Sequence, residues 1–347
     1  MMFRKSIDAS RALFWRGALA TALMILTAGC AQLGGIFAPT APFVSGEWAE
    51  LLKEVRVYER RIGFADTDNF ADLTQDYEAF VFCGVASRLV LPYSYQDPAI
   101  TWRESQTEEE CREHGRNADV YYGAVEAWGE VGTPVTPAMI TSKLDRFLYL
   151  VIHEDCHDQF KLPYGIEEAL CDLITFKGMA EFTRARFGAF SIEHRSILRY
   201  ADAQSRIARA TVATYTRLET LYGRHARREL TAEALLQERA AIYKAAEKPL
   251  AWTQGELTNV ALANHMTYSR HYPFLESVFD VLGRDLPHTI AFFRHVDKTK
   301  PEPETVMKQN RLKKGSVEFV RAYEVAVMET IRKALIGHID AGTAAVK

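Results

Sequence analysis

His153-Glu154-Asp155-Cys156-His157 decides how this 347-residue chain is interpreted, because the stretch spells H-E-x-x-H. Apolar residues recur at helical spacing from Ile140 to Val151 and lead into the motif, so we expect the motif to lie on a helix. Residues four apart on a helix share one face, so His153 and His157 can offer two imidazoles to one zinc ion. Glu154 stands beside them, placed to take a proton from a metal-bound water.

A zinc site with two histidines needs a third protein ligand. Phe160 and Pro163 stand where metzincins carry Gly and a third His, which excludes that arrangement. Glu168 follows a short segment that contains Pro163 and Gly165 and is typical of a tight turn. Two helices joined by so short a turn pack antiparallel, which brings Glu168 back towards the two histidines.

Glu167 competes for the ligand role, since only one of two adjacent helical residues can face the metal. We favour Glu168 because Asp172, four residues on, shares its face. Asp172 can accept a hydrogen bond from the free ring nitrogen of His153 or His157, the support that zinc-binding histidines usually have. The competing interpretation is an acidic first turn of a helix, where the helix dipole favours carboxylates.

The segment Glu168-Ala-Leu-Cys-Asp172 resembles the E-x-x-S-D element of the gluzincin metallopeptidases, with Cys171 in the place of Ser. A closer resemblance, over roughly residues 77–290, is to the bacterial predicted aminopeptidases, a family of lipoproteins. The residues that carry this resemblance are Asp119 to Gly129, Leu148 to His157, and Thr258 to Leu262 with Tyr268 and Pro273. The chain departs from the family at Asp155-Cys156, where small apolar residues are usual, and at Glu167, where Asn is usual.

The resemblance implies an α+β, mostly helical fold, with a small mixed α/β N-terminal lobe and a helical C-terminal lobe. It implies one metallopeptidase domain over residues 47–340, with the catalytic helices at about 140–180 and the helical lobe at 181–340. Zn²⁺ is the implied cofactor and a peptide the implied substrate, cleaved by zinc-activated water with Glu154 as the general base. An aminopeptidase is the narrower expectation.

The same resemblance suggests further site residues. Tyr268 is the candidate donor of a hydrogen bond to the oxyanion, with His265 and His271 as alternatives. Glu126 is the candidate anchor for the substrate's amine, because Gly123 to Ala127 is similar to the G-A-M-E-N strand of other zinc aminopeptidases.

The first 29 residues are typical of a bacterial lipoprotein signal. A basic start is followed by the apolar run Ala18 to Leu26 and by Thr27-Ala28-Gly29-Cys30. We expect cleavage before Cys30, a lipid on that cysteine, and a tether over residues 30–46. Ala31 is not the Asp that marks inner-membrane retention, so we expect the outer membrane, facing the periplasm. Removing four basic residues and one acid changes the formal charge from −3 to −6, which gives no signature of nucleic-acid binding.

An oxidising periplasm would permit disulfides between the four cysteines that follow Cys30. We expect Cys156 to pair with Cys171, since the antiparallel turn brings them together, and Cys83 to pair with Cys111. Buried thiols at positions 156 and 171 are the equal alternative.

Several shorter patterns indicate the organisation of the rest. We expect a helix over Glu47 to Tyr58, a strand pair within Tyr77 to Tyr95, and a strand over Asp119 to Trp128. Lys298 to Pro303 is a polar break, and the arginines of Arg206 to Arg228 indicate a solvated helix face.

Two other functions stay open on the sequence alone. One is a non-catalytic envelope lipoprotein that keeps the fold as a binding or assembly factor. The other is a zinc hydrolase that acts on a different amide, such as the peptide stems of the cell wall. The presence of every catalytic group in the H-E-x-x-H motif favours a peptidase.

Overall fold

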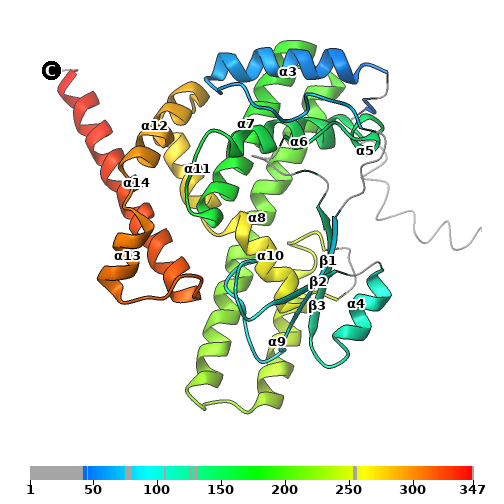
Figure 1. The fold of residues 1–347 in the computed structure, drawn as a ribbon, viewed down its shortest axis with the longest axis vertical. Helices are drawn as coiled ribbons and strands as arrows, with labels where there is room; N and C mark the ends of the chain where they lie inside the picture. Colours follow the sequence, from blue (N-terminus) through cyan, green and yellow to red (C-terminus); the bar gives the residue numbers. More distant parts are fainter. Residues whose placement is uncertain are drawn as a thin grey trace, which may run out of the picture.

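The structure is a computed structural model that describes residues 42–44, 46–74, 80–104, 107–125, 127, 132–252 and 256–345. Within these residues the fold is mostly helical with one small antiparallel sheet, which confirms the α+β expectation. Cys30 and Glu126 lie outside the described residues. Figure 1 shows α3 across one end of the molecule and the long helix α8 running from that end to the other.

The helices have the following bounds: α3 Trp48–Ile62, α4 Glu108–His114, α5 Pro137–Ile140, α6 Leu144–His157, α7 Tyr164–Phe187, α8 Ile192–Ala226, α9 Ala232–Ala246, α10 Asn259–Ser269, α11 Tyr272–Val281, α12 Leu286–Thr299, α13 Pro303–Asn310 and α14 Val317–Ala345. Side-chain caps begin several of them, with Thr107, Thr136, Ser191, Thr231, Thr258 and Asp285 each accepting a backbone N–H of the first turn. Among the described residues, no helix is both long enough and apolar enough to cross a membrane.

The sheet has three antiparallel strands in the order β2 (Thr101–Glu104), β1 (Phe80–Ala86) and β3 (Asp119–Val125). The expectation of a strand pair within Tyr77 to Tyr95 is wrong, because the partner of β1 comes later in the chain, at β2. Pro92 and Pro98 punctuate the segment between them, since proline cannot donate to a strand ladder. The side chain of Asp97 accepts hydrogen bonds from the N–H groups of Tyr93 and Ala99, which fixes this segment as turns.

Helices cover both faces of the sheet. A disulfide between Cys83 on β1 and Cys111 on α4 holds α4 against one face, with a sulfur–sulfur distance of 2.05 Å. α10 packs on the opposite face, where Val260 belongs to a buried apolar cluster with Ala86 and Ile100. Gly84 lies on this second face, with no room for a side chain between Trp102 and Val260.

The H-E-x-x-H motif lies on a helix, as its apolar spacing predicts, but the helix begins later than Ile140. Pro137–Ile140 forms the separate short helix α5, and α6 begins at Leu144 after an N-cap at Lys143. Ser142 does not cap α6, because its hydroxyl donates to the carbonyl of Met139 instead.

α6 and α7 pack against each other at the centre of the largest apolar core. The turn between them includes Pro163, and a disulfide joins Cys156 on α6 to Cys171 on α7, with their Cα atoms 5.5 Å apart. α8 covers this pair and carries a second core around Tyr215, Leu218 and Leu221. Arg206, Arg209 and Arg217 of the same helix are exposed, as expected for a solvated face.

Replacing Gly84 with Ala should destabilise the protein by about 1–3 kcal/mol, the usual cost of overpacking. The added Cβ would lie 2.6 Å from Trp102 Cζ3 and 2.9 Å from Val260 Cγ1. Gly337→Ala is the matched control, because nothing lies within 4 Å of that position on the exposed side of α14, and helix propensity favours Ala there. Urea unfolding of both variants measures the effect, and equal stabilities would contradict the packing described for β1.

Candidate metal centre

Three side chains converge from α6 and α7. His153 Nε2 lies 3.3 Å from His157 Nε2 and 3.2 Å from Glu168 Oε2, and the last two atoms are 3.5 Å apart. All three residues are buried, with at most 9% of each exposed. One atom from each residue makes up a group that could hold a metal ion, and it is the group of this kind found among the described residues.

These separations can be compared with those that a tetrahedral zinc ion requires. Zinc binds His nitrogen and carboxylate oxygen at roughly 2.0–2.1 Å, so neighbouring tetrahedral ligands lie about 3.3 Å from one another. The three separations in the structure, 3.2, 3.3 and 3.5 Å, are all close to that value. The donor set, two imidazoles and one carboxylate, also suits zinc and leaves the fourth position for a water or substrate. The residues therefore fit the ion.

The other nitrogen of each ring faces a carboxylate. His153 Nδ1 lies 3.3 Å from Asp172 Oδ1, although the angle falls outside that of a regular hydrogen bond. His157 Nδ1 lies 3.0 Å from Glu167 Oε1. Such carboxylates hold the ring orientation and present the second nitrogen to a metal. Glu167 therefore orients the His157 ring, whereas Glu168 belongs to the group that could hold a metal. Both glutamates lie at the site.

Both carboxylates are themselves fixed. The backbone N–H of Leu162 donates to Glu167 Oε2 at 2.8 Å. The hydroxyl of Tyr149 donates to Asp172 Oδ1 at 2.9 Å, and the Tyr149 ring stacks on His153 with centroids 4.9 Å apart. Tyr149 was not identified from the sequence, although it precedes His153 by one helical turn and that spacing could have revealed it.

The electrostatics of the site favour a cation. Burial by itself would lower the pKa of His153, but the carboxylates of Asp172 and Glu168 outweigh it and raise the pKa to about 9. Burial would raise the pKa of Glu168, but the adjacent imidazoles hold it well below its usual range. The negative charge of these carboxylates keeps protons on the imidazoles. The same negative charge attracts a divalent cation.

Two tyrosine hydroxyls belong to the surroundings of the site. The ring of Tyr268 on α10 lies 6.4 Å from that of His153, and burial together with the charge of Glu168 raises its pKa. Tyr164, the first residue of α7, has a raised pKa from burial and from its contact with the Glu168 carboxylate. The charge of Glu154 acts on both tyrosines. Because both pKa values are raised, both hydroxyls are protonated at neutral pH and able to donate a hydrogen bond.

A cavity of about 170 Å³ adjoins the metal group, with Tyr149, Asp172, Tyr268 and His265 among its lining residues. His265 also contacts the Trp252 ring, and burial lowers its pKa, which keeps the imidazole neutral. His271 points elsewhere, since its Nε2 lies 2.9 Å from Glu324 on α14. Of the two alternatives to Tyr268, only His265 lines this cavity.

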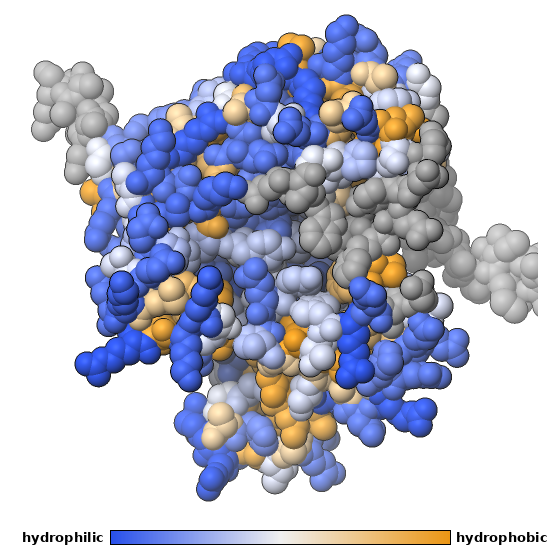
Figure 2. Space-filling model, in the orientation of Figure 1, coloured by the Kyte–Doolittle hydropathy of each residue, from blue (hydrophilic) through white to orange (hydrophobic). Residues whose placement is uncertain are grey.

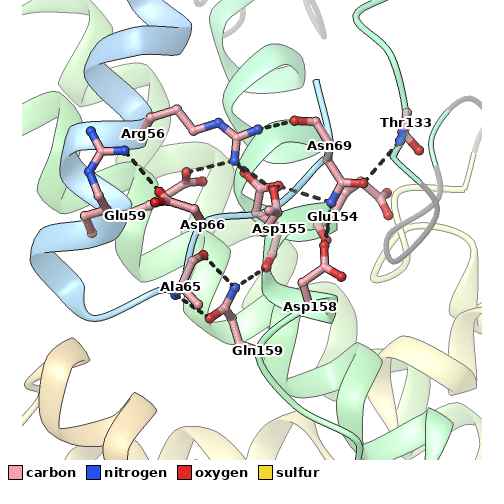
Figure 3. A network of polar contacts seen from close by, with 12 residues as sticks. Arg56, Glu59, Ala65, Asp66, Asn69, Thr133, Glu154, Asp155, Asp158 and Gln159 are labelled. Atoms are coloured by element: carbon pink, nitrogen blue, oxygen red, sulfur yellow. Dashed lines mark hydrogen bonds and ion pairs between the residues drawn. The ribbon is translucent and has the colours of Figure 1, made fainter. Parts of the chain in front are cut away.

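The opposite side of α6 is held by a buried polar network, shown in Figure 3. Asp155 is fully buried and accepts hydrogen bonds from Arg56 on α3 and from Thr67 and Asn69. Asn69 also donates to Asp158 and to the backbone carbonyl of Glu154. Asp155, a departure from the family pattern, therefore ties the motif helix to α3 and the segment that follows it.

A family model described as "Putative aminopeptidase" matches residues 102–309, more than half of the chain. The protein therefore belongs to that family, which indicates peptidase activity. No curated protein and no solved structure matches the chain.

The buried Glu59 in the network of Figure 3 predicts a pH-dependent stability. Burial and the neighbouring Asp155 charge raise the Glu59 pKa well above its usual value. Between about pH 4.3 and the raised pKa of the folded state, the folded protein holds a proton that the unfolded chain has released, so stability falls as pH rises, by up to about 1.4 kcal/mol per unit. Glu59→Gln keeps a donor for Asp155 without titrating, so its stability relative to the parent should increase over this range.

The measurement is urea unfolding at several pH values from 5 to 8. Glu50→Gln on the exposed face of the same helix is the control, and its stability relative to the parent should vary by less than about 0.5 kcal/mol. Parallel pH profiles for Glu59→Gln and the parent would show that Glu59 is ionised in the folded protein.

Proposed function

We propose that the protein is a zinc metallopeptidase, anchored to the outer membrane through a lipid on Cys30 and facing the periplasm. The observation that carries the catalytic part is the spacing of His153 Nε2, His157 Nε2 and Glu168 Oε2, which fits a tetrahedral zinc ion. Membership of the putative aminopeptidase family supports a peptide substrate. The anchor is supported by the signal-like residues 1–30.

Each residue has a part in the proposed reaction. His153, His157 and Glu168 would hold the zinc, and Asp172 and Glu167 would fix the two imidazole rings. When bound, zinc would polarise the peptide carbonyl and lower the pKa of a water molecule towards neutrality. Glu154 accepts the proton of the attacking water on its carboxylate and passes it to the leaving amine. Tyr268 donates a hydrogen bond to the oxygen that gains negative charge.

We expect about one zinc per molecule in the purified mature chain. Glu168→Ala should lower zinc affinity by well over 100-fold, because it removes a ligand. Glu167→Ala is the matched control on the adjacent residue, and the loss of a ring-orienting partner should cost about 10–100-fold. Glu154→Gln should retain zinc and lose at least about 10²-fold in kcat. Metal analysis and peptide hydrolysis measure these effects.

Two outcomes would redirect the interpretation. A parent without zinc would favour the binding or assembly factor, whereas a parent with zinc but without any peptidase activity would be consistent with either that factor or a zinc hydrolase of a different amide. An active Glu154→Gln variant would exclude Glu154 as the base. Substrates with a free or blocked N-terminus separate the two peptidase types, since an aminopeptidase cleaves only the free one and equal cleavage indicates an endopeptidase.

Tyr268→Phe should lower kcat by about 10²–10³-fold, the usual loss when one oxyanion donor is removed. Zinc content should stay unchanged, because Tyr268 is not a proposed ligand. Tyr164→Phe is the matched comparison, since the same hydroxyl is removed from the same surroundings, and we expect a smaller loss. A large loss confined to Tyr164→Phe would move the donor role to Tyr164.

A further inference from the structure

The turn between α7 and α8 carries an uncharged, apolar tip. Residues 187–192 read Phe-Gly-Ala-Phe-Ser-Ile, and the nearest charged residues along the chain are Arg186 and Glu193. Phe190 is 91% exposed and Ile192 52% exposed. Single exposed apolar residues are ordinary, but leaving a Phe in water forgoes roughly 1.5–3 kcal/mol of burial. Burial of Phe190 and Ile192 against an apolar partner would therefore be favourable.

This tip lies at the end of the molecule where the chain enters the fold. Pro42 and Val44 hydrogen-bond to Leu144 and Ser142 at the start of α6. Trp48 at the start of α3 and Phe187 at the end of α7 pack against the same core, and Glu54 pairs with Arg186. Phe43, 67% exposed, adds apolar surface at this end, and Figure 2 shows apolar residues among the hydrophilic ones there.

The length of the tether limits which end can reach a membrane. If Cys30 carries the lipid, the eleven residues between it and Pro42 span at most about 40 Å. α8 has 35 residues and is therefore about 52 Å long. Its far end, shown at the bottom of Figure 1, is therefore separated from the α7–α8 turn by more than the tether can span. The turn at that far end offers no large exposed apolar residue to insert among acyl chains and carries the exposed charged residues Arg227, Arg228 and Glu229.

We propose that the α7–α8 turn docks on the membrane, with Phe190 and Ile192 inserted among the lipid headgroups and upper acyl chains. The proposal rests on the lipid anchor of the proposed function and extends it by fixing which end of the domain faces the bilayer. The metal centre lies at the other end of the α6–α7 pair, near the turn that contains Pro163, so docking leaves it directed away from the lipid.

The test places an environment-sensitive fluorophore at Phe190→Cys in the full acylated chain, reconstituted in phosphatidylethanolamine–phosphatidylglycerol vesicles. Glu229→Cys, labelled in the same way, is the control at the opposite end of α8. The Phe190→Cys label should shift to shorter wavelength and be quenched by brominated acyl chains, whereas the Glu229→Cys label should show neither effect. Zinc content is measured on the same samples, so failure of the catalytic proposal is detected separately.

Three results would overturn the docking proposal. If the chain floats with the vesicles but the Phe190→Cys label keeps its aqueous spectrum, the domain hangs free of the membrane. If the chain does not float with the vesicles, the lipid anchor fails and docking fails with it, while the metal centre is unaffected. If the shift also occurs in the Cys30→Ser chain without vesicles and grows with protein concentration, a second copy of the chain covers the turn instead.

Discussion

The burial of several ionisable groups at one point is the constraint on which the rest of the structure depends. Two imidazoles, with carboxylates on both their nitrogens, are enclosed by α6, α7 and α10. Charged groups removed from water must be paired or hold a metal, or they lose their charge. The rings and carboxylates satisfy this among themselves, while the Nε2 atoms and Glu168 Oε2 meet at a spacing suited to an ion. The surrounding helices can therefore be interpreted as a rigid support for this cluster.

That support acts from two sides of one helix. On the metal side, Tyr149, Asp172 and the Leu162 N–H fix the groups that orient the histidines. On the other side, Asp155 is bound by Arg56, Thr67 and Asn69. An active-site geometry must be held to within a fraction of an ångström, which a helix packed on one face alone does not achieve. Asp155 stands in the middle of the motif, where the family usually has a small apolar residue. Its hydrogen bond with Arg56 attaches α6 to α3.

The sequence allowed the central part of this architecture to be predicted, because the decisive information is local. The i,i+4 spacing of His153 and His157 and the short turn before Glu168 define the ligand geometry without knowledge of distant contacts. The turn likewise predicts that Cys156 meets Cys171, and the structure joins them. The pairing of β1 with β2, the cluster around Asp155 and the approach of α10 depend on residues far apart in the chain. Periodicity carries no information on such contacts, so the strand pair expected within Tyr77 to Tyr95 is wrong. Tyr149 is a different case, because its spacing of one helical turn from His153 is local information.

The bond between Cys156 and Cys171 has a consequence for how the proposed zinc ion would be acquired. In the reduced chain, two thiols stand within a few residues of His157 and Glu168. Thiolates are strong zinc ligands, and together with a histidine they form the donor set of structural zinc sites, which are closed to substrate. Oxidation withdraws both sulfurs from this competition and leaves imidazole and carboxylate as the remaining donors. For the zinc site proposed above, correct metal loading would therefore follow oxidative folding, and a chain that met zinc while still reduced could form a stable but inactive ligand set.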